Sequence, residues 1–378
     1  MKFNVSSTAL YYRLQAISRV ISSKNSIAIL DCFLLELKEG KLHLTASDSE
    51  TTLCTTLEVN DVEGDLRVAI PMKTLLDGLK EISEQPLSME INPANFEITV
   101  SYLNGKYTLM GQQAEEYPLP KAIDSEAVSL NLPIGTLLEG VNTCAFAAGD
   151  DELRKVMSGI YFDIETEHLT LVATDGHKLV RLKLNSIQAG EKAAFILPKK
   201  PAGLLKALLI KEEAEAEGSV SISFDDKQAS FSFGTSRMVC RLIEGRFPNY
   251  NAVIPQNSPH TILIDRLAFL GALKRVAIFS STSNSQVKLS FDTNNVTIST
   301  KDIDFSTAAE EKLACEYSGG KLEIGFKSAF LIDILNNIAT DNVEIGLADP
   351  SRAGIIVPTE QNEGEDLLTL LMPMMINY

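Results

Sequence analysis

The sequence predicts an α+β fold made of three copies of one unit, each with two helices packed on antiparallel sheets. The chain has 378 residues, and at roughly 150 residues per domain this length corresponds to two or three domains. A strand–turn–strand pattern with a central aspartate occurs at Asp48, Asp175 and Asp302, and both intervals are 127 residues. A fixed long period is the signature of a repeated architecture, so we predict three units.

Each copy begins with a short strand and a helix. Apolar residues recur there at three- and four-residue spacing, which is typical of an amphipathic helix. In the first and third copies they are Leu10, Leu14, Ile17 and Ile21, and Leu267, Leu270, Leu273 and Ala277. We predict these first helices over 6–24, 134–148 and 265–280.

Two strands joined by the aspartate-containing turn come next. In the second copy they read LVATDGHKLVRL (171–182), an apolar run, a polar turn and a run that alternates apolar and basic residues. The corresponding segments are LTASDSETTL in the first copy and ISTKDIDFSTAA in the third. Because the aspartate occupies all three turns, its side chain is expected to accept hydrogen bonds from nearby backbone N–H groups.

A second helix and a set of hairpins complete each copy. Pro71, Pro198 and Gly325 again stand 127 residues apart, and proline is tolerated at a helix start. We predict the second helices over 71–84, 198–211 and 326–338. Alternating runs with the turn dipeptides Asn104-Gly105 and Asp225-Asp226 predict antiparallel hairpins.

Linkers rich in Pro, Asn and Ser separate the copies at 119–129 and 254–261. We therefore expect an N-terminal domain over 1–125, a central domain over 126–254 and a C-terminal domain over 255–378. The acidic segments 212–218 and 361–366 are interpreted as solvated loops.

The composition is that of a globular protein, with 45% hydrophobic and 22% charged residues. The first residues, MKFNVSSTALYYRL, show neither a long apolar segment nor a cleavage site, and no apolar run approaches the roughly 20 residues that span a bilayer. We expect a cytoplasmic protein with no membrane partner. The five cysteines are scattered without metal-ligand spacing, so we expect buried thiols and no metal.

Positive charge is concentrated on the predicted helices. They carry a formal charge of +7, so the rest of the chain, at −16 overall, carries −23. If the helices face one way, they form a basic surface that attracts phosphates without reading bases. The alternative is that lysines on the helices serve solubility alone.

The sharpest enzyme candidate is the pair Asp175 and His177, because a carboxylate beside an imidazole can serve as an acid/base pair. The corresponding positions for the histidine are Glu50 and Asp304, so the pair is not repeated. A hydrolase-type enzyme with an interdomain site around these two residues is the alternative function. No phosphate-binding, nucleotide-binding or nucleophile motif supports it.

The chain ends in LLTLLMPMMINY, which is apolar to its last residues. Methionine-rich apolar surface is adaptable and suits the binding of varied peptides. The alternative is a tail folded against the core.

Three features coincide: the triplicated unit, the ATDGHKL turn of the second copy and the MPM tail. Together with GRFPNY (245–250) they closely resemble the β subunits of bacterial DNA polymerase III, the sliding clamps, and the resemblance covers the whole chain.

The resemblance implies a DNA clamp, in which a head-to-tail homodimer closes into a ring of six similar domains with helices lining the hole. Such a protein is a non-enzymatic processivity factor that encircles double-stranded DNA without sequence preference and needs no cofactor. Its implied partners are the polymerase III catalytic subunit, the clamp loader, other polymerases and repair proteins, which bind through short linear peptides. The implied location is the bacterial cytoplasm, at the nucleoid during replication. The net charge of −16 argues against adhesion to phosphate backbones, but a ring held on DNA by topology needs only weak phosphate contacts.

The family's peptide pocket lies between its second and third domains. Carried over position by position, it falls on Met157, Thr174, Gly176, His177, Leu179, Pro248, Val253, Leu371, Met372, Pro373 and Met374. The chain departs from the family at Lys178, where arginine is common, and at Ala252, where a basic residue is common. The tail also continues through Tyr378, so a somewhat different peptide preference is expected.

For DNA contacts, similarity to the family suggests Lys24, Lys73, Arg154, Lys199 and Lys200. Val156 stands where some relatives have an aromatic contact.

For the dimer interface, similarity points to Tyr107 and Leu109 of one chain against Ile278 and Phe279 of the other.

Overall fold

The computed structural model describes residues 1–22, 24–25, 27–123, 127–213, 218–281, 284–302 and 304–376. The chain forms two compact units, one made of Met1–Leu138 and Gly203–Leu242, the other of Glu139–Ala202 and Ile243–Tyr378. The α+β class is confirmed, since helices and antiparallel sheets occur in both units. The central copy contributes strands to both units.

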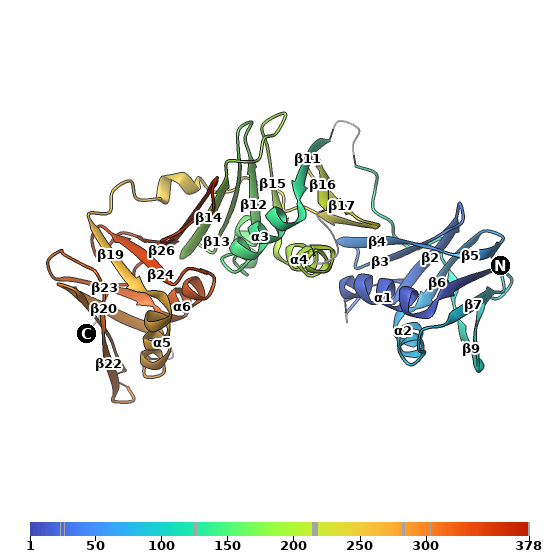
Figure 1. The fold of residues 1–378 in the computed structure, drawn as a ribbon, viewed down its shortest axis with the longest axis horizontal. Helices are drawn as coiled ribbons and strands as arrows, with labels where there is room; N and C mark the ends of the chain where they lie inside the picture. The colour runs from blue at the N-terminus through green and yellow to red at the C-terminus, as the bar shows by residue number, and fades with distance from the viewer. Residues whose placement is uncertain are drawn as a thin grey trace. The chain divides into compact units, whose positions relative to one another are not determined.

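The first unit holds two antiparallel sheets (Figure 1). The five-stranded sheet has the order β5-β1-β7-β8-β9, with β5 (Asn60–Glu63), β1 (Lys2–Ser6), β7 (Pro86–Ile91), β8 (Glu97–Tyr102) and β9 (Gly105–Met110). The nine-stranded sheet has the order β10-β6-β2-β3-β4-β18-β17-β16-β11, with β10 (Gln112–Gln113), β6 (Leu66–Pro71), β2 (Cys32–Lys38), β3 (Lys41–Ser47), β4 (Thr51–Glu58), β18 (Ser236–Arg241), β17 (Gln228–Phe233), β16 (Ser219–Phe224) and β11 (Val128–Pro133). Its β4–β18 pairing joins the first copy to the second.

The second unit repeats this plan. The eight-stranded sheet has the order β15-β12-β13-β14-β26-β25-β24-β19, with β15 (Ala193–Pro198), β12 (Gly159–Ile164), β13 (Leu169–Thr174), β14 (Lys178–Leu184), β26 (Glu365–Leu371), β25 (Gly354–Pro358), β24 (Asn342–Leu347) and β19 (His260–Asp265). The four-stranded sheet has the order β22-β21-β20-β23, with β22 (Thr307–Ala314), β21 (Asn295–Asp302), β20 (Gln286–Asp292) and β23 (Leu322–Lys327). Here β14 and β26 join the second copy to the third.

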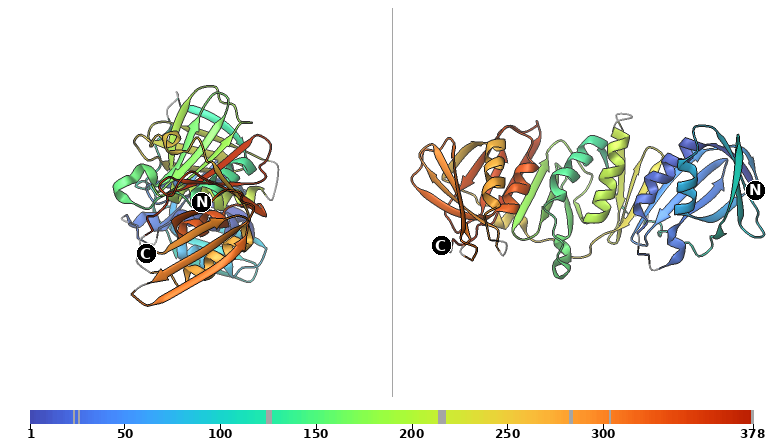
Figure 2. Two further views of the ribbon diagram at one scale, coloured as in Figure 1. Left: turned by 90° about the vertical axis from the view of Figure 1, so that its left-hand side faces the viewer. Right: turned by 90° about the horizontal axis from the view of Figure 1, so that it is seen from below.

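All six predicted α-helices are present, and five of them are shorter than predicted. They are α1 (Ser7–Ile17), α2 (Met72–Lys80), α3 (Ile134–Ala145), α4 (Lys199–Glu213), α5 (Arg266–Ala277) and α6 (Ser328–Asn336). Short 3₁₀ helices are η1 (Ser18–Val20), η2 (Ala28–Asp31), η3 (Glu152–Met157) and η4 (Tyr250–Val253). Helices α1 and α2 pack side by side, as do α5 and α6 (Figures 1 and 2).

Capping side chains fix two of the helix starts. The Ser6 hydroxyl accepts a hydrogen bond from the Ala9 N–H at 3.1 Å, and the Asp265 carboxylate accepts one from the Ala268 N–H at 2.7 Å. Each satisfies a backbone donor that the first helical turn leaves unpaired.

Two details of the helix prediction were wrong. The first helix gives way to η1 and then to extended backbone at Ile21, so Lys24 lies in a turn and not on a helix. Gly325 lies inside β23, and α6 begins three residues later at Ser328. The net positive charge of the fourth helix is also smaller than predicted, because α4 continues through Glu212 and Glu213. The rest of the predicted acidic loop, 214–217, lies outside the described residues.

The apolar stripe of the fifth helix is shifted from the predicted one. Phe269, Leu273 and Val276 are buried in the core of the third copy, but Leu267 is 59% exposed. In the first helix the predicted positions Leu10, Leu14 and Ile17 are all buried. Four of the five cysteines are buried and Cys54 is half-buried. Among the described residues, no helix has the length and apolarity needed to cross a membrane.

Candidate functional site

The three repeated aspartates are turn residues. Asp175 Oδ1 accepts hydrogen bonds from the backbone N–H groups of His177 and Lys178, both at 2.8 Å. Asp48 and Asp302 do the same for the N–H groups two and three residues further on. A carboxylate committed to two backbone donors is a structural element, so the hydrolase hypothesis finds no support.

The turn of the second copy is built to a fixed shape. The Thr174 hydroxyl donates to Lys178 O at 2.7 Å and accepts from the Gly176 N–H at 3.1 Å. Gly176 has a φ of +88°, and a Cβ there would lie 2.5 Å from the Arg154 guanidinium. The positive φ favours glycine at this position, whereas the flexible arginine tip could move aside. Met157 lies against the same turn, with its sulfur 3.9 Å from the same Cβ position.

Strand β26 brings the tail to this turn. Leu371 pairs with Lys178 in the ladder, and the Met372 N–H donates to His177 O at 2.8 Å. Leu179 and Leu371 are buried, whereas Met372 is 41% exposed. The predicted pocket residues of the turn and of the tail therefore meet, with Leu179 and its ladder partner Leu370 forming a floor and Met372 a wall. Leu371 faces the other side of the sheet and belongs to the core of the third copy.

The tail beyond Met372 is held against the core by its backbone. Met374 N–H donates to Gly325 O at 2.8 Å, and the Gln286 side-chain amide donates to Met375 O at 2.7 Å. The Met375 side chain is nevertheless 84% exposed. The backbone of the tail is therefore folded against the core, as the alternative expected, while peptide binding by its exposed methionine side chain stays a prediction. Asn377 and Tyr378 lie outside the described residues.

The GRFPNY segment is anchored by aromatic packing. The Phe247 ring stacks on Tyr161 with centroids 4.6 Å apart, and the Tyr250 hydroxyl donates to Asp163 Oδ2 at 2.7 Å. Burial and the adjacent carboxylate raise the pKa of Tyr250. Phe247 and Tyr250 share a buried cluster with Leu179. This packing fixes the segment that carries Pro248 and the half-exposed Val253. No sequence pattern had indicated Tyr161 or Asp163.

Helix α6 contributes further residues that the sequence did not reveal. The His177 ring stacks on Phe330 with centroids 5.8 Å apart. Lys178 is only 6% exposed, and its ammonium lies 3.2 Å from Asp333 Oδ2 and 4.6 Å from the Phe330 ring centroid. An ion pair and a cation–π contact therefore join the turn to α6.

The predicted DNA-contacting residues lie in different settings. Lys199 begins α4, and its ammonium binds both Asp150 carboxylate oxygens at 2.8 Å. Arg154 binds Asp151 at 2.9 Å. Lys73 on α2 and Lys200 on α4 are exposed. A cavity of about 390 Å³ beside Lys199 is lined by Asp150, Glu152, Lys155 and Ser158, among others. Val156 packs against the buried cluster of Phe247.

The residues suggested for the dimer interface differ in exposure. Ile278 is 76% exposed and Phe279 is 43% exposed, just after α5. On β9 the Leu109 side chain is buried, and the buried Tyr107 hydroxyl has no hydrogen-bond partner among the residues that the structure describes. Burial raises the pKa of Tyr107 to about 12.

No group of three or more His, Cys, Asp or Glu side chains within the described ranges has the arrangement of a metal site.

Three family models match the chain in succession. The N-terminal domain of the DNA polymerase III beta subunit matches residues 1–121, the central domain matches residues 131–249 and the C-terminal domain matches residues 251–375.

Relatives match over the full length. The beta sliding clamp of Haemophilus influenzae is 28% identical and that of Pseudomonas aeruginosa is 26% identical, and each match covers 99% of this chain and 100% of the relative. A crystal structure of the Pseudomonas aeruginosa DNA polymerase sliding clamp with ligand has the same fold, with a TM-score of 0.93 at 24% identity over 100% of both chains. The chain belongs to the family of bacterial DNA polymerase III beta subunits, the DNA sliding clamps, which are non-catalytic processivity factors.

Proposed function

We propose that two chains assemble head to tail into a closed ring around duplex DNA. The observation that carries this proposal is that β9 and β22 are edge strands of their sheets. An edge strand presents unpaired backbone groups that pair with a second chain. Exposed Ile278 and Phe279 flank this contact with apolar surface, while Tyr107 and Leu109 contribute through the backbone of β9. Head-to-tail contacts form a ring only if the rotation from each chain to the next returns to the starting point. Three similar domains per chain favour this, because two chains then supply six similar steps.

The three domains have the proposed bounds 1–125, 126–254 and 255–378. In the ring they contribute six similar segments, with Lys24, Lys73, Arg154, Lys199 and Lys200 toward the DNA. Lysine and arginine bind phosphates without reading bases, so the ring slides.

The pocket of the turn and tail binds short linear peptides. Its exposed wall carries His177, Met372 and Val253, above a floor of Leu179 and its ladder partner Leu370. Leu371 supports the tail from the opposite face of the sheet. Thr174, Gly176 and Met157 shape the turn, and Pro248, Pro373 and Met374 complete the rim. The peptides belong to the polymerase III catalytic subunit, the clamp loader, other polymerases and repair proteins. These partners act in the bacterial cytoplasm, at the nucleoid during replication.

Topological retention tests the ring. The purified protein is loaded by a bacterial clamp loader onto a nicked circular plasmid and separated by gel filtration. We expect co-elution with the circle and loss of the protein after the plasmid is cut once, because a ring slides off a free end. A plasmid with both ends blocked by bound protein is the control and should retain the clamp. Equal retention on circular and open linear DNA would disprove encirclement.

A further inference from the structure

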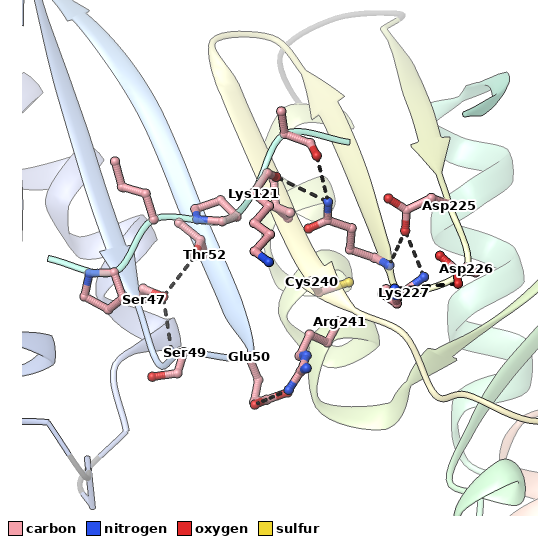
Figure 3. A pocket seen from close by; sticks show the side chains of 16 residues that line it. Ser47, Ser49, Glu50, Thr52, Lys121, Asp225, Asp226, Lys227, Cys240 and Arg241 are labelled. Carbon is pink, nitrogen blue, oxygen red and sulfur yellow. Dashed lines mark hydrogen bonds and ion pairs between the residues drawn. The ribbon is translucent and has the colours of Figure 1, made fainter. Parts of the chain in front are cut away.

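The first unit contains a second pocket with the same construction as the peptide pocket (Figure 3). Its volume is about 500 Å³, and it lies where β4 pairs with β18. Three segments enclose it: the Asp48 turn, the linker of residues 118–122 and the turn of residues 225–228. None of the predicted site residues lines it.

The strand pairing repeats that of the peptide pocket. The Arg241 N–H donates to Glu50 O at 2.9 Å, as the Met372 N–H donates to His177 O at 2.8 Å. Glu50 and His177 stand 127 residues apart, at equivalent places in their turns.

The turn itself is also repeated. The Ser47 hydroxyl donates to Thr51 O and accepts from the Ser49 N–H, both at 3.2 Å. The Thr174 hydroxyl makes the equivalent pair of bonds in the other turn. The backbone frame of a peptide pocket is therefore present twice in the chain.

The linker wall is repeated as well. Tyr117 and Pro118 correspond to Phe247 and Pro248, and the Tyr117 hydroxyl donates to Cys32 O at 3.2 Å. The Gln228 side-chain amide donates to Lys121 O at 3.2 Å and to Ala122 O at 3.3 Å. These bonds hold the proline-containing linker, residues 118–120, along one side of the pocket.

Two apolar side chains of the other pocket have polar counterparts here, and its histidine has an acidic one. Met372, His177 and Leu179 of the other pocket are replaced by Arg241, Glu50 and Thr52. Figure 3 shows the Lys121 side chain pointing into the pocket and Arg241 beside Glu50. A hydrophobic anchor suits this lining less well than a polar one.

The charges define the kind of group that fits. Lys121 has no ion-pair partner among the described side chains, while Glu50 is already paired with Arg241 at 3.4 Å. Asp225 Oδ1 accepts the N–H groups of Lys227 and Gln228, both at 2.8 Å, as a turn residue. Asp226 and Lys227 pair with each other at 4.0 Å. The donors open to a ligand are therefore the Lys121 ammonium and the N–H groups of Arg241 that its one contact with Glu50 leaves unused among the described side chains, beside an apolar wall formed by Leu119 and its two neighbouring prolines.

We propose that this pocket binds an extended peptide segment in which an acidic side chain stands next to an apolar one. The carboxylate lies between Lys121 and Arg241, and the apolar side chain packs on the linker wall around Leu119. Cys240 takes no covalent part, because burial raises the pKa of its thiol to about 12 and the thiolate is the reactive form.

The test uses an array of octapeptides with Asp or Glu beside Leu, each matched with the Asn or Gln peptide. Fluorescence anisotropy then measures the affinity of the best-binding peptide for the full-length protein. We expect the acidic peptide to bind about tenfold more tightly than its amide match, and Lys121→Ala or Arg241→Ala to remove that difference. Lys80→Ala, which changes an exposed lysine of α2 outside the pocket, should leave it unchanged.

Other outcomes overturn the proposal. These are an array on which no acidic peptide exceeds its amide match, or binding that survives both pocket substitutions. Two results together would indicate an anion site only: inorganic phosphate displaces the bound peptide, and an acidic peptide without apolar residues binds equally well. In parallel, binding of a polymerase-tail peptide is measured on the wild-type protein and on Met372→Ser. This tests the turn-and-tail pocket separately, so that failure of one proposal is distinguished from failure of the other.

Discussion

At the scale of single residues, His177 and Lys178 show how adjacent side chains connect two copies. His177 stacks on Phe330, and Lys178 pairs with Asp333, so both reach α6 of the third copy. Comparison of the three copies showed that His177 differs from the equivalent residues Glu50 and Asp304. The sequence did not indicate its partners on α6. Stacking and ion pairing between residues more than 150 positions apart depend on how the sheets bring the copies together, which no local pattern encodes.

Gly325 provides a test of the anchored tail. A Cβ there would lie 2.7 Å from Met374 O and 2.8 Å from the Gln286 amide nitrogen. Gly325→Ala should therefore displace the tail and weaken polymerase-peptide binding about tenfold, or ~1.4 kcal/mol. Gly320→Ala is the matched control, because nothing lies within 4 Å of its Cβ. Isothermal titration with one peptide compares the three proteins, and equal affinities would show that the tail position does not control the pocket.

At the scale of elements, helix type and order follow from the sequence while helix ends do not. Apolar spacing predicted the first helix of each copy, because burial of one face dominates helix stability. The recurrence of Pro71, Pro198 and Gly325 predicted the second helix of each copy. The end of α1 was missed because the chain turns at Ile21 despite continued apolar spacing. The position of Gly325 was missed because the 127-residue period slips by two residues before α6.

The start of α4 yields a prediction about DNA binding. Asp150 is exposed and holds the Lys199 ammonium through both of its oxygens. Asp150→Asn should release this lysine to phosphates and steepen the dependence of log K on log salt by about 0.9. Lys199→Glu should change the slope in the opposite direction.

A matched control exists in the same unit. Asp349 pairs with Arg352 at 3.2 Å in the exposed connection between β24 and β25. Asp349→Asn should leave the slope unchanged. A salt series with fluorescent duplex DNA measures all four proteins, and an unaltered slope for Asp150→Asn would exclude Lys199 as a masked DNA contact.

At the scale of the whole molecule, the repeat predicted three copies and their approximate boundaries. It did not predict that the central copy shares one sheet with the first copy and another with the third. Strand order between copies depends on pairing across long separations, and the sequence constrains this weakly. The candidate pocket residues were predicted mainly from the family resemblance. Their contacts depend on the pairing of β14 with β26, which the sequence did not predict.

Ring closure yields a prediction about assembly. Ile278→Asp places a charge in the proposed contact between chains and should convert dimers to single chains at micromolar concentration. Leu153→Asp is the control, because Leu153 is 95% exposed and lies outside β9 and β22. Sedimentation velocity distinguishes the two, and a wild-type protein that sediments as a single chain would contradict the ring.

The sharing of sheets between copies has a consequence for folding. Cutting the chain at the linker near residue 120 would separate β4 from β18 and leave both with open backbone groups. The units that repeat in sequence are thus not the units that fold. Each copy completes its neighbour's sheet, so the three copies are bound to gain and lose their structure in a coupled way.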